Sequence, residues 1–130
     1  MKNKVLIELT KAESLLNNWK WLPGSQVKVL INHLIKSIDL MTSHLLNKET
    51  VLERDYLSMS AFKLFSDESV ESSFYDTYYH LKSLSRKDIQ RVDSESINIV
   101  GDKGTINAER DYFEFFINNV RTVFDEVFNP

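Results

Sequence analysis

Cysteine is absent from this sequence, and glycine and proline are scarce: the 130 residues include three glycines and two prolines. Without cysteine the chain cannot form disulfides, iron–sulfur clusters or cysteine-rich zinc sites, and the absence fits a reducing compartment. Glycine and proline interrupt helices, and their combined share here lies far below the usual ~12%. The scarcity of both residues therefore favours long, uninterrupted helices.

Neither sign of charge dominates the chain. Sixteen Lys and Arg residues oppose nineteen Asp and Glu residues, and the net charge of −3 argues against indiscriminate DNA binding while leaving room for a local basic patch. No apolar run approaches the ~18 residues that span a bilayer, and the apolar stretch after Lys4 is too short for a signal peptide. We therefore expect a cytoplasmic protein with no membrane partner, folded as a single domain over residues 1–130.

Apolar residues recur at steps of three and four along most of the chain, as they do on one face of an amphipathic helix. The short "LPGS" segment around Pro23 and Gly24 ends the first of these segments, so that the first two helices should pack antiparallel. Thr50 and Glu53 match a capping box that opens a third helix. The predicted helices cover Lys2 to Lys20, Ser25 to Leu45, Thr50 to Phe65, Asp67 to Arg86, and Asn107 to the C-terminus.

The pattern changes near residues 95–107. Ile97 and Ile99 alternate with polar residues, and Gly101 and Gly104 bracket a four-residue turn. These signals predict a loop or a small β-hairpin. Taken with the helices, they predict an all-α fold, an up-down bundle of four to five helices with this loop or hairpin inserted before the last helix.

The last predicted helix is unusually rich in phenylalanine. Such a helix either buries all these rings in the core and at its margins or exposes some of them as a dimer face, and the sequence leaves both alternatives open. We expect a homodimer. The helix holds five of the eight phenylalanines of the chain, at positions 113, 115, 116, 124 and 128.

The segment "YYHLKSLSRKDIQR", residues Tyr78 to Arg91, gathers cations and tyrosines near the end of the fourth helix. Aromatic rings can stack on bases while cations hold phosphates, so the segment predicts a surface for single-stranded RNA. The alternative is a solvated helix end, where cations complement the macrodipole and tyrosines rim the core. The candidate binding residues are Tyr75, Tyr79, Lys82 and Arg86 on one helix face, with His80 beside them and Lys87 and Arg91 beyond the helix end.

Signatures of catalysis and of metal binding are missing from the sequence. Asp76 and His80, four residues apart, suit acid–base work, but pairs at this spacing are common on helix surfaces. His33 and His44 lie about 16 Å apart along one helix and cannot share a metal ion, although His33 with Asp39 or Glu13 of a neighbouring helix is not excluded. There is no phosphate-binding glycine loop and no Gly-x-Ser-x-Gly motif. We therefore expect no catalytic residue, no metal and no cofactor.

The layout of the chain resembles the HEPN domains of prokaryotes, small helical bundles found in toxin–antitoxin and other defence systems. The resemblance covers almost the whole chain and rests on two segments: "LTKAESLLNNWKWLPGSQVKVLINHLIKSIDLMTSHLL" near the N-terminus and the charged, aromatic "NAERDYFEFFINNVRTVFDEVF" at the C-terminus. It implies a helical dimer that binds RNA, a nucleotide or a protein partner.

Active members of that family cleave RNA through an arginine followed four to six residues later by a histidine. No arginine of this chain precedes a histidine at that spacing; the nearest match is reversed, His80 before Arg86. We therefore expect a non-catalytic HEPN-like module that binds RNA or a protein partner. Two alternatives remain: a ribonuclease with a non-standard site around His80 and Arg86, and a protein–protein interaction bundle that uses the aromatic C-terminal helix.

Overall fold

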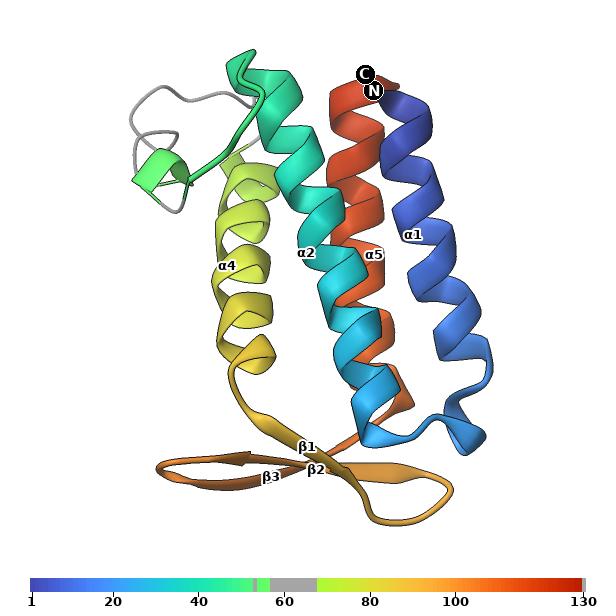
Figure 1. Ribbon diagram of the computed structural model, residues 1–130. Helices are drawn as coiled ribbons and strands as arrows, with labels where there is room; N and C mark the ends of the chain where they lie inside the picture. The colour runs from blue at the N-terminus through green and yellow to red at the C-terminus, as the bar shows by residue number, and fades with distance from the viewer. Residues whose placement is uncertain (53, 57–67, 130) are drawn as a thin grey trace.

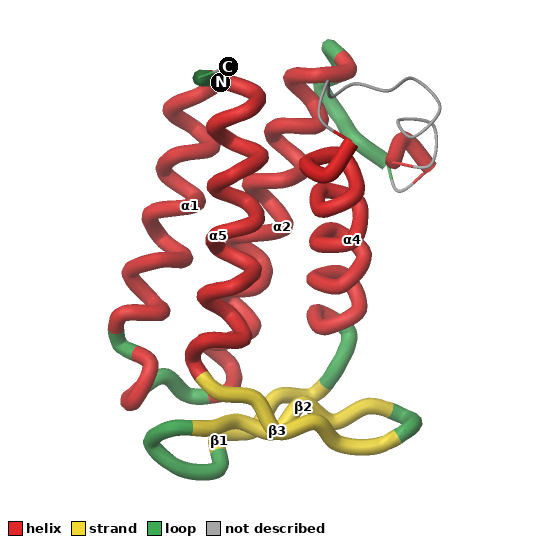
Figure 2. The backbone as a smooth tube through the Cα atoms, turned by 180° about the vertical axis from the view of Figure 1, so that it is seen from behind, coloured by secondary structure: helices red, strands yellow, loops and turns green. Residues whose placement is uncertain are grey.

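Within the described part of the chain, four long helices stand side by side, and a three-stranded sheet lies across one end of them (Figure 1). The same arrangement seen from behind shows the sheet below α4 and α5 (Figure 2). The structure is a computed structural model that describes residues 1–52, 54–56 and 68–129. In chain order its elements are α1 (Lys2–Asn17), the 3₁₀ helix η1 (Trp19–Trp21), α2 (Gly24–Leu46), α4 (Glu68–Ser85), β1 (Asp88–Arg91), β2 (Ser96–Gly101), β3 (Gly104–Glu109) and α5 (Arg110–Phe128).

The sheet is antiparallel, with strand order β1-β2-β3. Ile89 of β1 pairs with Ile99 of β2, and Ile97 of β2 pairs with Ala108 of β3. These four side chains are buried. Because residues at alternate positions of a strand share one face, the apolar face of the sheet covers the end of the helical bundle.

The all-α prediction is wrong, because the fold is mixed α/β. A hairpin does lie near residues 95–107, formed by β2 and β3, but it belongs to a sheet whose first strand the helical pattern missed. In β1 only Ile89 is buried among four residues, so the strand has too little alternation to be distinguished from a polar helix end. Asn107, predicted to cap the last helix, lies in β3, and α5 begins at Arg110.

The core is one cluster of apolar residues drawn from the helices and the sheet. On α5, Phe113, Phe116 and Phe124 are buried and Phe128 packs against the cluster, whereas Phe115 remains 61% exposed. Most of the aromatic residues of this helix thus belong to the core and its margin, and a single ring is left at the surface.

Helix α2 ends at Asn47, whose φ of 53° is left-handed, a conformation that asparagine tolerates better than most residues. The helix predicted from Thr50 to Phe65 and the cap predicted at Asp67 lie largely outside the described residues. Within the described part, the Asp55 carboxylate accepts a hydrogen bond of 2.8 Å from the Leu52 N–H. None of the helices in that part is long and apolar enough to cross a membrane.

At Gly24, the first residue of α2, the helix lies very close to the backbone of β1. A Cβ at this position would lie 2.0 Å from the carbonyl oxygen of Ile89 in β1. Real Cβ atoms do not approach a carbonyl this closely, so any side chain would push the strand away from the helix. Glycine is therefore required here for close approach of two backbones.

We expect Gly24→Ala to lower the free energy of unfolding by about 1–3 kcal/mol, because the added methyl group overpacks a rigid backbone contact. Urea denaturation followed by circular dichroism measures the change. Gly101→Ala is the matched control: a Cβ there would lie 3.3 Å from Cε of Lys87, a flexible side chain that can move. Equal loss of stability in both variants would contradict this account.

Candidate nucleic-acid interface

The predicted face of α4 is only partly open to solvent. Tyr79 is 41% exposed, and Arg86 is exposed one residue beyond the end of the helix. Tyr75 is half-buried, and its hydroxyl donates a hydrogen bond of 3.3 Å to the Glu71 carboxylate. Burial, followed by the charge of Glu71, raises the pKa of Tyr75. The face therefore offers one free tyrosine ring rather than two.

Lys82 is half-buried. Burial raises the pKa of Asp39 on α2, while a hydrogen bond from Tyr56 and the charge of Lys82 act in the opposite direction. The positive charge of Lys82 is thus partly engaged by a carboxylate of the bundle. We consequently place it at the margin of the interface.

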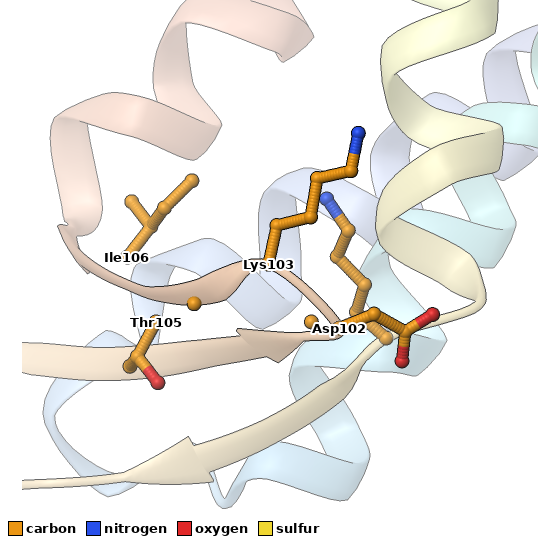
Figure 3. A pocket seen from close by; sticks show the side chains of 7 residues that line it. Asp102, Lys103, Thr105 and Ile106 are labelled. Carbon is orange, nitrogen blue, oxygen red and sulfur yellow. The ribbon is translucent and has the colours of Figure 1, made fainter.

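Two lysines from separate segments line one pocket at the tip of the β2–β3 hairpin (Figure 3). Lys87 follows α4, and its side chain packs over Gly101. Lys103 lies in the turn of the hairpin, and its side chain extends to the same side of the hairpin as that of Ile106, away from Thr105 (Figure 3). The pocket has a volume of about 390 Å³ and is lined by Lys87, Gly101, Asp102, Lys103, Gly104, Thr105 and Ile106.

Both lysines of this pocket are available to a ligand. Neither forms an ion pair with any residue that the structure describes, although Asp102 also lines the pocket. The hairpin turn was predicted from its glycines, but its lysine was not predicted to join the cationic segment. The only signal in the sequence was the position of Lys103 between two glycines, which indicates an exposed turn.

His80 faces a different direction from the cations. Its ring lies 5.4 Å from the ring of Phe116 on α5, and it lines a groove between α4 and α5 together with Asp76. In the same groove the Asn119 amide donates a hydrogen bond of 3.3 Å to the Thr77 hydroxyl. Over the described ranges no hydrogen bond joins Asp76 to His80. The structure therefore separates His80 from the lysines with which the sequence had grouped it.

Arg91 joins the sheet to the α1–α2 connection. Its Nε donates a hydrogen bond of 2.9 Å to the Leu22 carbonyl, and one terminal nitrogen donates to the carbonyls of Leu22 and Trp19 at 2.7 and 2.6 Å. The guanidinium carbon also lies 4.5 Å from the centre of the Trp19 ring. The indole N–H of Trp19 in turn donates a hydrogen bond of 2.8 Å to the Glu95 carbonyl. Arg91 is thus occupied by protein acceptors and is remote from the role predicted for it.

A buried carboxylate on α1 forms a pair that the sequence analysis missed. Glu8 is 5% exposed, and one of its oxygens lies 2.6 Å from Nδ1 of His33, while the other lies 3.3 Å from Nζ of Lys36. The one indication in the sequence that Glu8 is buried was its position beside Leu9 in an apolar stripe. In the described part of the chain, no group of three or more His, Asp or Glu residues is arranged to hold a metal ion.

Comparison with known proteins gives no match: no protein-family model, no curated protein and no solved structure resembles the chain. The resemblance to HEPN domains therefore stays a prediction.

We expect Arg91→Lys to lower the free energy of unfolding by about 1.5–3 kcal/mol. The planar guanidinium group donates from two nitrogens to the Leu22 and Trp19 carbonyls, whereas lysine has a single ammonium nitrogen. Urea denaturation measures the loss. Arg110→Lys, which keeps an exposed ion pair with Glu114, is the control and should change stability little. An Arg91→Lys variant as stable as the wild type would mean that the hydrogen bonds to Leu22 and Trp19 contribute nothing.

The Glu8 pair predicts a dependence of stability on pH. Burial alone raises the pKa of Glu8, but hydrogen bonds from His33 and Lys36 and their charges outweigh it, so that the pKa lies below its ordinary value. The carboxylate therefore stabilises the fold above the unfolded pKa, and this contribution is lost as the pH falls through the folded pKa.

We expect Glu8→Gln to flatten the decrease in stability of the wild type as the pH is lowered from about 5 to about 3. Denaturation curves at several pH values measure it. The exposed Glu114→Gln serves as the control and should keep the wild-type slope. If the Glu8→Gln variant lost stability as steeply as the wild type, the acid sensitivity would arise elsewhere.

Proposed function

We propose that this chain is a non-catalytic, cytoplasmic, HEPN-like module that binds single-stranded RNA at the hairpin tip and the adjoining end of α4. The observation that carries the proposal is the convergence of Lys87 and Lys103 on one open pocket. Four residues form what we call the tip surface: Tyr79, Arg86, Lys87 and Lys103. In a chain with a net charge of −3, cations gathered at one place favour an anionic ligand there.

The chemistry of the tip surface suits a phosphate backbone with bases beside it. Ammonium and guanidinium groups neutralise phosphates, and an exposed tyrosine ring provides a stacking platform for an unpaired base. Gly101 and Gly104 carry no side chains that would cover the backbone of the turn. Because Asp102 opposes the two lysines, we expect moderate affinity and strong dependence on salt.

Binding is favoured over cleavage by the position of His80. His80 lies within α4, whereas Arg86, six positions further on, lies beyond the end of that helix. His80 also contacts the ring of Phe116 in the α4–α5 groove, rather than the pocket of the lysines. A general base and a phosphate-binding cation need to reach the same scissile group.

We expect the double variant Arg86→Ala/Lys87→Ala to bind single-stranded RNA more weakly and with a slope of log K against log salt reduced by about 1.4, for two lost phosphate contacts. Gel-shift titrations at several salt concentrations measure both quantities. The control Lys4→Ala/Lys20→Ala removes the same charge from α1 and η1, and should bind as the wild type does.

Equal affinity and slope in the wild type and the Arg86→Ala/Lys87→Ala variant would refute the tip surface as the RNA site. Incubation of the same RNA with the purified wild type provides a second readout. Cleavage that disappears in His80→Ala, while circular dichroism shows an intact fold, would instead support the ribonuclease alternative.

A further inference from the structure

The outer edge of β3 is exposed. In the three-stranded sheet β3 is the terminal strand, and no other element among the described residues pairs with its free side. The strand lies at the edge of the sheet nearest the viewer in Figure 2. The opposite edge, by contrast, is approached by Gly24 at the start of α2. Of the residues of β3 only Ala108 is buried, and Ile106 is 53% exposed.

Natural proteins usually protect such an edge with lysine, proline, a bulge or a very short strand. The six residues of β3, "GTINAE", include neither lysine nor proline, and they pair with β2 in an unbroken register from Gly104 to Glu109. An exposed, regular edge of this length is a template for another strand.

The register of the hairpin shows which backbone groups are free. A turn of two residues, Asp102 and Lys103, joins the paired Gly101 and Gly104. In an antiparallel hairpin the pair that flanks such a turn is hydrogen-bonded, and bonded and non-bonded pairs then alternate. Ile106 consequently bonds to β2, while the N–H and C=O groups of Thr105 and Asn107 face outward.

We propose that β3 pairs antiparallel with β3 of a second copy of this chain, about a two-fold axis that passes through Ile106, to form a continuous six-stranded sheet. In this register Ile106 lies opposite Ile106 of the second copy. Thr105 of each copy lies opposite Asn107 of the other, so that the outward backbone groups of both strands meet their partners. An isologous contact of this kind closes at two copies and leaves no repeating edge.

The charges at the two ends of the edge support a second copy as the occupant. The same two-fold axis places Lys103, in the turn beside β3, opposite Glu109 at the end of β3 of the second copy, so that this complementary pair occurs at each end of the joined edge. Opposite charges facing each other across antiparallel strands stabilise the pairing, whereas like charges oppose it. Moving the axis by two residues, to Gly104 or Ala108, loses both complementary pairs.

Exposed apolar groups lie on the side where the second bundle would stand. Paired residues of antiparallel strands project to the same face, so both bundles would cover the same face of the joined sheet. Figure 3 shows Ile106 on the helical side of the hairpin, where it would meet its own copy.

The absence of cysteine from the chain permits a sharp test by disulfide trapping. In a non-hydrogen-bonded antiparallel pair the two Cα atoms are about 4.5 Å apart, within the range of a disulfide. Under mild oxidation Ile106→Cys should form a covalent dimer. Thr105→Cys and Asn107→Cys should each remain largely monomeric alone and cross-link when mixed, because Thr105 faces Asn107 of the other copy.

The matched control is Val92→Cys, which is 52% exposed but lies outside β3. If Ile106→Cys cross-linked no faster than Val92→Cys, the proposed axis would be wrong. Cross-linking of Thr105→Cys alone as fast as the mixture with Asn107→Cys would contradict the register.

Charge reversal tests the same interface without oxidation. The wild type should elute as a dimer by size exclusion with light scattering, and Glu109→Lys, which sets like charges opposite Lys103, should shift it to monomer. Lys103→Glu/Glu109→Lys should restore the dimer. Ile106→Lys should be monomeric with an unchanged circular dichroism spectrum, and Val92→Lys should remain dimeric.

A wild type that is monomeric at every concentration, or a dimer that survives Ile106→Lys, would overturn the proposal. The inference does not rest on RNA binding. Lys103 belongs both to the tip surface and to the joined edge, but Arg86 and Lys87, the residues varied in the RNA experiment, lie outside that edge. The two results can therefore be told apart.

Discussion

The guanidinium group of Arg91 holds the sheet to the helical bundle. It donates to the carbonyls of Leu22 and Trp19 and lies over the indole ring of Trp19, while that indole donates to Glu95 in the β1–β2 connection. The connection between α1 and α2 is thereby held to both ends of the β1–β2 connection. The Trp19 carbonyl also accepts a hydrogen bond from the Leu22 N–H. Hydrogen bonds from a charged donor such as the guanidinium group are stronger than those from a neutral N–H.

The position of the sheet follows from this joint and from Gly24. The arginine fixes one end of β1 to the connection, and the missing side chain at Gly24 lets α2 rest on the Ile89 carbonyl. The apolar face of β2 then closes the end of the bundle with Ile97 and Ile99. The location of the tip surface is a consequence, because the hairpin can extend under α4 only when β1 is held in place.

The helices were predictable from the sequence because each buries a broad stripe with a regular period. Val27, Leu34 and Met41 of α2, for example, repeat at helical spacing and are all buried. Strand β1 was not predictable in this way, because a strand with a single buried residue, Ile89, shows no alternation of apolar and polar side chains. Asn107 was misassigned for a related reason: asparagine suits a helix cap, but pairing with β2 decided its conformation.

The candidate site was predictable only as a list of nearby residues. The sequence grouped Tyr75, His80, Lys82 and Arg91 because they lie close together along the chain, yet the fold directs them to Glu71, to α5, to Asp39 and to the α1–α2 connection. Lys103 joined Lys87 through the hairpin register, which no spacing along one helix can reveal. Tertiary contacts, rather than helical periodicity, thus decide which cations remain free.

The Arg91 joint also has a consequence for the order of folding. Its hydrogen bond to Leu22 connects residues 69 positions apart, whereas α1 and α2 are neighbours along the chain and need only a short loop. Contacts that close long loops form late, because the entropy of closure has to be overcome before they stabilise anything. We therefore expect the α1–α2 hairpin to form first and the sheet to dock last. A chain caught before docking would expose the apolar faces of β2 and the bundle end together.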